Sequence, residues 1–177
     1  MESKYLKLAL LLFVLAISHF FVMARADLIK DSCKNTYNYT LCVSTLRSDP
    51  STSNSTINVK GLAYVMLNVL NANNTKILAE VSHLLNTTKD PLAIQCLHQC
   101  FSDYMVSKDF IGNARSYLDT NNYGEANGEM AFAADQAIDC ESAFTGPPNA
   151  IKSPLTTAND VFEQLAYITL DIINILG

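Results

Sequence analysis

The fold is decided by residues 90–118, which read DPLAIQCLHQCFSDYMVSKDFIGNARSYL. Asp90 is a good N-cap, and Pro91 suits the first helical position, where a backbone N–H would have no intrahelical partner. Small or apolar residues then recur in steps of four and three, at Ala93, Leu97, Cys100, Tyr104, Ser107, Ile111, Ala114 and Leu118. This spacing predicts one helix, roughly 40 Å long, with a narrow seam of the coiled-coil kind. A helix of that length buries its seam only against other long helices.

Residues 57–85 precede this helix and also show helical spacing. The patch Asn71-Ala72-Asn73-Asn74 interrupts the apolar line, and we expect a kink or a polar surface face there because Asn is a modest helix former. The apolar line itself consists of Leu62, Met66, Val69, Ile77, Val81 and Leu84.

Two more helices are predicted after residue 118. The segment 123–144 has a seam of mainly small residues, so its partner can approach closely, and the segment 156–176 opens with Thr157 and Asp160 in the spacing of a capping box. The first seam contains Ala126, Met130, Ala133, Ala137, Cys140 and Phe144, and the second contains Ala158, Phe162, Leu165, Thr169, Ile172 and Leu176.

The connections between these helices are short, at residues 119–122 and at Gly146-Pro147-Pro148-Asn149. Short connections make neighbouring helices antiparallel. The sequence therefore predicts an all-α protein in which residues 57–177 form an up-down-up-down four-helix bundle. Residues 27–50 form a helical hairpin extension ahead of it, joined by a linker rich in Ser, Thr and Asn.

Residues 1–26 have the features of a secretory signal peptide. Lys4 and Lys7 precede an apolar run from Leu8 to Val22, and Ala24-Arg25-Ala26 follows as a small-x-small cleavage signal. The run is short for a membrane anchor, which is the alternative interpretation. We expect a mature domain of residues 27–177 that is secreted to the apoplast (the cell wall), with the vacuole as another destination, and that has no membrane span.

The chain carries a net charge of −5, and removal of residues 1–26 leaves nine basic and sixteen acidic side chains, a net charge of −7. An acidic domain is repelled by phosphate backbones, so nucleic acid is excluded as an expected partner. A basic protein partner suits this charge, and the alternative is an acidic surface that simply remains solvated.

Five cysteines are present, so one is left unpaired. Cys33 and Cys42 are close enough in sequence to close a small hairpin in an oxidising compartment. Cys140 needs a partner on the 90–118 helix, where Cys96 and Cys100 are one turn apart and either could reach it. Cys100 lies on the seam and Cys96 beside it, so we predict the pair Cys100–Cys140 and a free, buried or half-buried thiol at Cys96.

Four asparagines begin N-glycosylation sequons: Asn38, Asn54, Asn73 and Asn86. Four sequons in a secreted chain indicate that at least some carry glycan and face solvent.

The sequence shows no catalytic constellation: no nucleophile elbow, no zinc-protease helix and no phosphate or dinucleotide loop. His98 lies between Cys96 and Cys100, but residues two apart on a helix point about 200° apart, which argues against a metal site. Asp103, Asp109 and Asp119 are spread along the helix and do not pair as acid and base. We expect no enzyme activity, no cofactor and no metal.

The cysteines and their neighbours resemble the plant invertase and pectin methylesterase inhibitor family over essentially the whole mature chain. Cys100-Phe-Ser-Asp-Tyr104 is similar to the family's Cys-x-x-x-Tyr, and Cys140-Glu141-Ser-Ala-Phe144 is similar to its Cys-Glu-x-x-Phe. Further similar stretches are Cys33 to Cys42, Leu46 to Pro50, Lys60 to Ala63, Ser153 to Thr156 and Ile172 to Leu176. The resemblance implies a four-helix bundle with an N-terminal hairpin and disulfides that join the first two and the last two of the four matched cysteines.

The resemblance also implies a secreted inhibitor that covers the active-site cleft of a carbohydrate-active enzyme. Invertase inhibitors of the cell-wall type carry Pro-Lys-Phe between the second and third bundle helices, where this chain reads Asn121-Asn122-Tyr123-Gly124-Glu125-Ala126-Asn127. The missing motif, the tyrosine and the stretch after Phe144 favour pectin methylesterase. The hairpin would also suit an invertase inhibitor, and a cysteine frequent in pectin methylesterase inhibitors is replaced by Ala166.

We therefore expect pectin methylesterase as the partner, with invertase as the alternative and a non-inhibitory carrier of a small apolar ligand as a more remote one. The contact surface is expected on the second and third bundle helices and the turn between them. The candidate contact residues are Asp119, Asn121, Asn122, Tyr123, Glu125 and Glu129.

Overall fold

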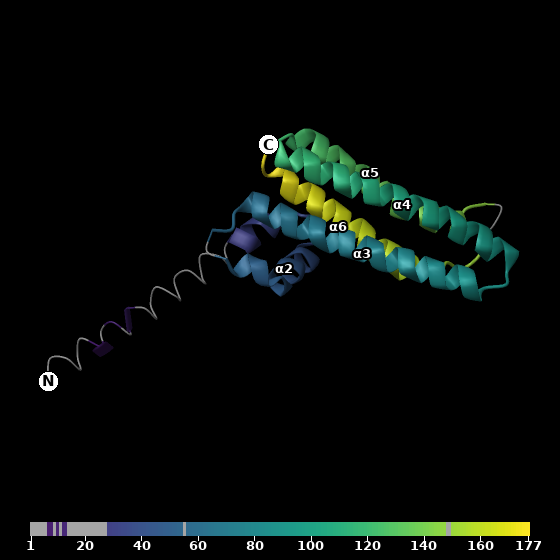
Figure 1. Ribbon diagram of the computed structural model, residues 1–177, viewed down its shortest axis with the longest axis horizontal. Helices are drawn as coiled ribbons and strands as arrows, with labels where there is room; N and C mark the ends of the chain where they lie inside the picture. The colour runs from purple at the N-terminus through teal and green to yellow at the C-terminus, as the bar shows by residue number, and fades with distance from the viewer. Residues whose placement is uncertain (1–6, 9, 11, 14–27, 55, 148–149) are drawn as a thin grey trace.

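The computed structural model describes residues 7–8, 10, 12–13, 28–54, 56–147 and 150–177, so most of the expected signal peptide lies outside the described residues. All regular structure in the described part is helical. Four long helices, α3 (Val59–Thr87), α4 (Pro91–Asp119), α5 (Tyr123–Thr145) and α6 (Thr156–Asn174), lie side by side in Figure 1 with short connections at alternate ends. This arrangement is consistent with the expected up-down-up-down bundle. No helix in the described part of the chain is long and apolar enough to cross a membrane.

The helix α4 confirms the prediction made from residues 90–118. Its N-cap is Asp90, whose Oδ1 accepts a hydrogen bond from the Leu92 N–H over 3.0 Å, and Pro91 is its first residue. Ala93, at the start of the predicted seam, is half-buried, and the seam from Leu97 to Leu118 is fully buried. Two further residues of α4, Cys96 and Asp103, are buried beside the seam.

The patch Asn71-Ala72-Asn73-Asn74 does not break the first bundle helix, and only part of it is the polar surface face that was expected. Residues Val59–Thr87 form one continuous helix, and Asn74 is completely buried in it. The amide Nδ2 of Asn74 donates a hydrogen bond to the backbone carbonyl of Tyr104 over 3.0 Å. A buried asparagine is tolerated here because it has a hydrogen-bond partner on the neighbouring helix. Asn71 and Ala72 have the expected exposed position, and Asn73 is half-buried.

The seam of α5 is buried as predicted, and Ala134 joins it. The expected capping box at the start of α6 is wrong. The helix begins at Thr156 with Leu155 at the N-cap and no side-chain cap, while Ser153 Oγ accepts from the Leu155 N–H over 3.1 Å. Asp160 instead accepts a hydrogen bond from Gln164 Nε2 over 2.9 Å.

The N-terminal extension folds as a hairpin that contacts α6. Residues 28–33 are helical, α2 spans Tyr39–Ser48, and a short 3₁₀ helix, η1, spans Pro50–Ser53. The turn of the hairpin is fixed to α6 at three points. The Tyr37 and Tyr167 rings lie 5.2 Å apart, the Tyr37 N–H donates to Asp171 Oδ2 over 2.7 Å, and Asn38 Nδ2 donates to Gln164 Oε1 over 2.6 Å.

Both predicted disulfides are present, Cys33–Cys42 in the hairpin and Cys100–Cys140 between α4 and α5. Cys96 is the free cysteine, and its side chain is only 3% exposed. The second disulfide lies at the point where the seams of α4 and α5 meet, so it fixes the register of the two helices.

Candidate docking surface

The six contact residues predicted from the sequence lie together where α4 passes into α5. Asp119 ends α4, Asn121 and Asn122 form the turn, and Tyr123, Glu125 and Glu129 belong to the first two turns of α5. Four of them are exposed, whereas Tyr123 and Glu129 are half-buried.

The turn between α4 and α5 is held by α3. Lys60 Nζ donates to Asn121 Oδ1 over 2.8 Å, and the Tyr123 hydroxyl donates to the same oxygen over 2.8 Å. Asn121 has a φ of 60°, a left-handed conformation that asparagine tolerates better than most residues. The shape of the turn is therefore fixed within the protein itself.

Residues of α3 and α4 extend this support. The Tyr64 hydroxyl donates to the Asp119 carboxylate, and the Arg115 guanidinium carbon lies 5.5 Å from the centre of the Tyr64 ring. Arg115 also donates to the side-chain oxygen of Asn68. Burial, followed by the hydrogen bond to Asp119, raises the pKa of Tyr64 to about 12, so the phenol stays a donor.

These supporting residues were missed by reasoning from the sequence. Lys60, Tyr64 and Asn68 recur every four residues, which places them on one line of α3 and is the signal that could have singled them out. Their partners lie on α4 and in the α4–α5 turn, and no spacing within α3 points to them.

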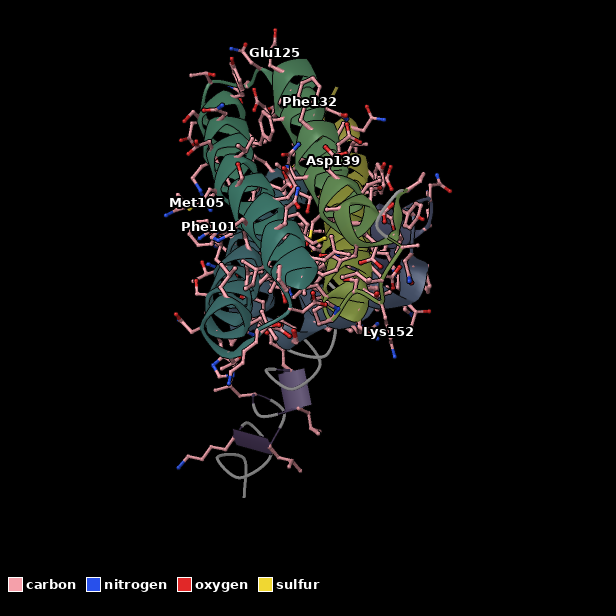
Figure 2. The ribbon with its side chains drawn as sticks, turned by 90° about the vertical axis from the view of Figure 1, so that its right-hand side faces the viewer. Phe101, Met105, Glu125, Phe132, Asp139 and Lys152 are labelled. Atoms are coloured by element: carbon pink, nitrogen blue, oxygen red, sulfur yellow. A yellow bond between two sulfur atoms is a disulfide. The ribbon has the colours of Figure 1, made fainter. Side chains whose placement is uncertain are left out.

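A second feature is an apolar contact outside the core, here called the α4–α5 patch, formed by the half-buried Phe110 on α4 and the exposed Phe132 on α5. Phe132 is 54% exposed. The Phe110 and Phe132 rings lie 5.5 Å apart and connect the two helices across their seam. Figure 2 shows Phe101 and Met105 on the outer side of α4 and Phe132 on α5. An exposed aromatic ring that packs on a second one outside the core offers apolar surface to a partner.

Carboxylates border this patch. Asp109 on α4 and Glu125, Asp135 and Asp139 on α5 are exposed. Glu129 accepts a hydrogen bond from Asn113 Nδ2 over 3.2 Å, across the same pair of helices. In Figure 2 Glu125 and Asp139 lie along the same helix as Phe132. An apolar centre with a polar rim is the usual composition of a protein–protein interface.

Asp103 lies beneath the same surface and was not expected to be buried. Its side chain is 5% exposed, and its Oδ1 accepts from Gln99 Nε2 over 2.7 Å while Oδ2 has no hydrogen-bond partner in the described part of the chain. Burial, reinforced by the nearby Asp139 carboxylate, raises the pKa of Asp103 to about 6, despite the opposing hydrogen bond from Gln99. This carboxyl group is therefore largely neutral in mildly acidic solution.

Cys96 has the buried position that its place beside the seam predicts. Its thiol donates to the backbone carbonyl of Ala143 over 3.0 Å, and burial raises its pKa. A surface hollow of about 300 Å³, lined by Gln95, Cys96, Gln99 and Ala143, lies beside it. A protonated, buried thiol is a poor nucleophile, so nothing here activates Cys96.

No group of three or more His, Cys, Asp or Glu side chains in the described residues is placed to hold a metal ion, and His98 is exposed. A larger cavity of about 490 Å³ lies at the hairpin end and is lined by charged residues such as Asp31, Lys34 and Asp171 as well as apolar ones. Its lining does not suit a carrier of an apolar ligand.

Comparison with known proteins places this fold and sequence in one group. Residues 27–172 match the family described as plant invertase/pectin methylesterase inhibitor. A pectinesterase inhibitor from Actinidia deliciosa is 32% identical over 98% of this chain and 95% of its own length. A putative invertase inhibitor from Platanus orientalis is 28% identical over 89% of this chain and 94% of its own. The crystal structure of a mutant form of a pectin methylesterase inhibitor from Arabidopsis superposes with a TM-score of 0.70 at 21% identity, over 82% of this chain and 94% of that one.

Proposed function

Because the chain belongs to the plant invertase/pectin methylesterase inhibitor family, we propose that it inhibits pectin methylesterase by forming a stoichiometric complex that covers the active-site cleft. The family consists of enzyme inhibitors, so the chain performs no reaction of its own. Relatives carry pectinesterase or invertase in their names, and invertase is therefore the second candidate target.

The observation that carries the proposal is the α4–α5 patch with its acidic border. Phe132 is more than half exposed, and its ring packs against the half-buried ring of Phe110. This contact holds the Phe132 side chain in place, so it presents a fixed apolar surface. Burying such an aromatic residue at the centre of an interface is a common source of binding free energy. The patch lies on two helices that a disulfide holds in register, so little conformational entropy is lost when a partner binds.

The charge of the surface indicates the kind of enzyme that binds. The exposed carboxylates of Asp109, Glu125 and Asp139 border the patch, and residues 27–177 carry a net charge of −7. Such a surface attracts a positively charged rim around the enzyme's cleft and speeds association at low ionic strength. A partner enzyme with basic side chains around its cleft would suit this surface.

The α4–α5 turn supports pectin methylesterase over invertase. The turn lacks Pro-Lys-Phe, and the amide oxygen of Asn121 is already occupied by Lys60 and Tyr123. A turn whose polar groups are used internally has few left to enter a sugar-binding site. We therefore assign the turn to the edge of the complex and the α4–α5 patch to its centre.

The proposed place of action is the apoplast, with the vacuole as the alternative, reached after removal of residues 1–26. The apolar run and the Ala24-Arg25-Ala26 signal support this route.

The test uses the secreted protein in two titrations. Fixed amounts of pectin methylesterase and of invertase are mixed with increasing protein, and ester hydrolysis and sucrose hydrolysis are followed at mildly acidic pH. We expect pectin methylesterase activity to fall to a plateau near one equivalent and invertase activity to stay unchanged. Loss of invertase activity alone would transfer the assignment to the second target, and no loss of either at micromolar protein would remove the proposed function.

A further inference from the structure

The four sequon asparagines lie on one part of the protein. Asn38 is the N-cap of α2, Asn54 follows η1, and Asn73 and Asn86 belong to α3. Residues 89–177, which include α4, α5 and α6, contain no Asn-x-Ser/Thr sequon. Any N-glycan must therefore lie on the hairpin, on the linker after it or on α3.

Asn86 has an environment that accommodates a glycan. It is exposed in the last turn of α3, and its Nδ2 donates one hydrogen bond, to the Ser82 carbonyl over 2.9 Å. An amide nitrogen carries two hydrogens. One of them can hold the bond to Ser82 while the other is replaced by a sugar.

Asn54 is exposed as well, and only its oxygen is used. Oδ1 accepts from the Thr56 N–H over 3.2 Å and from the Thr56 hydroxyl over 3.1 Å, so the two ends of the sequon contact each other in an Asx turn. Its Nδ2 has no partner among the described residues and is free to carry a substituent.

Asn38 and Asn73 differ from these two because both are half-buried. The Oδ1 of Asn73 is closed off from solvent and has no hydrogen-bond partner among the residues that the structure describes. Both polar atoms of Asn38 are occupied: Oδ1 accepts from the Leu41 N–H over 3.0 Å, and Nδ2 donates to Gln164 on α6 over 2.6 Å. Asn38 keeps a second Nδ2 hydrogen, as Asn86 does, but a sugar in its place would lie where the hairpin packs on α6. At Asn73 a sugar would be attached to a half-buried side chain.

We infer that the secreted protein carries N-linked glycans at Asn54 and Asn86 and none at Asn38 and Asn73. The donor is a lipid-linked diphosphate oligosaccharide of the secretory pathway. A bond forms between Nδ2 and the anomeric carbon of the first sugar, the bond from that carbon to the diphosphate breaks, Nδ2 loses one proton, and the lipid diphosphate leaves.

The two glycans would flank α3, one before its first residue and one in its last turn. At about 1.5 Å per residue this helix is roughly 40 Å long, so the sugars would cover its two ends. The α4–α5 patch would stay bare. The glycosylated ends of α3 would then face solvent, while α5 and the side of α4 that packs on α5 remain available to a partner.

The test is site-by-site mapping of the protein secreted by plant cells. Peptide-N-glycosidase treatment converts each glycosylated Asn to Asp, and mass spectrometry of the peptides locates the change. We expect conversion at positions 54 and 86 only. The variants Asn54→Gln and Asn86→Gln should each remove one glycan from the intact mass, and Asn73→Gln, the matched change inside α3, should remove none. A glycan at position 38 or 73, or an unmodified Asn54 or Asn86, would overturn the inference.

Discussion

The hydroxyl of Tyr104 on α4 donates a hydrogen bond to Oδ1 of Asn159 on α6, over 2.7 Å inside the bundle. The Nδ2 of Asn159 donates in turn to Glu141 Oε2 on α5 over 2.8 Å, so one amide joins three helices. Glu141 also accepts from the Thr156 hydroxyl over 2.7 Å. Tyr104 and Glu141 belong to the two cysteine motifs, and the network explains in physical terms why a tyrosine and a glutamate accompany Cys100 and Cys140.

We expect Asn159→Leu to lower the free energy of unfolding by about 2–3 kcal/mol, because the Tyr104 hydroxyl would lose its buried partner and Glu141 would lose one donor. The neighbouring exposed change Asp160→Ala should alter it by less than about 0.5 kcal/mol. Urea unfolding of the two variants and the unmodified protein measures both values. Equal stability of Asn159→Leu and the unmodified protein would show that the network contributes nothing.

The buried carboxyl of Asp103 predicts greater stability in acid. Its pKa rises from 3.8 in the unfolded chain to about 6 in the folded protein, because burial favours the neutral form. Asp103 therefore contributes its full share to the free energy of unfolding below about pH 4, and this share is lost as the pH rises through about 6. The loss amounts to at most about 3 kcal/mol. Burial also raises the pKa of Glu163 and Asp171, so their contributions have the same sign.

The variant Asp103→Asn should therefore flatten the decline in the free energy of unfolding between pH 4 and pH 7. The exposed change Asp109→Asn, one and a half turns along α4, should leave the decline as it is. Denaturant titrations at several pH values provide the comparison. A decline of the same size in Asp103→Asn and in the unmodified protein would contradict the assignment.

The disulfide Cys100–Cys140 is expected to dominate the cysteine contribution to stability. It closes a loop of about 40 residues, worth roughly 4 kcal/mol in the chain-entropy view, so the double change Cys100→Ala, Cys140→Ala should lower the melting temperature strongly. Cys96→Ala removes only a buried thiol and should cost about 1 kcal/mol. Calorimetry under non-reducing conditions measures the melting temperature of both variants. A larger decrease for Cys96→Ala than for the double variant would contradict this expectation.

The turn at Asn121 predicts a difference between two substitutions at one position. Both Asn121→Gly and Asn121→Ala remove the acceptor for Lys60 and Tyr123, but alanine is also strained at a φ of 60°. We expect the alanine variant to be less stable than the glycine variant by about 1 kcal/mol. Thermal unfolding of the pair measures this difference, which would be absent if the turn relaxed to a negative φ.

Much of the bundle could be predicted from the sequence because the seams of α4 and α5 follow a strict period. The alternation of four and three from Leu97 to Leu118 specifies a buried stripe, and the position of Cys100 on that stripe distinguishes it from Cys96 as the partner of Cys140. Local chemistry also sufficed for the start of α4, where Asp90 and Pro91 act as expected.

What could not be predicted depends on contacts between distant residues. Asn74 looked like a break in the helix, because its partner is a backbone carbonyl of Tyr104, 30 residues away in sequence. The burial of Asp103 follows from the packing of α5 and has no signature in the spacing of α4. Phe132 lies outside the α5 seam and is exposed. An apolar residue at such a position is a feature of the sequence that could have indicated the docking surface.

The most direct test of the account compares two exposed aromatic residues on opposite parts of the protein. Phe132 lies in the α4–α5 patch and Tyr39, 45% exposed, lies on the hairpin. The affinity of the unmodified protein, Phe132→Ala and Tyr39→Ala for pectin methylesterase is measured by titrating enzyme activity, with urea unfolding to establish that all three are folded. The account predicts an affinity at least tenfold weaker for Phe132→Ala, and for Tyr39→Ala an affinity within about twofold of the unmodified protein. Unchanged inhibition by a folded Phe132→Ala protein, or a loss confined to Tyr39→Ala, would contradict it.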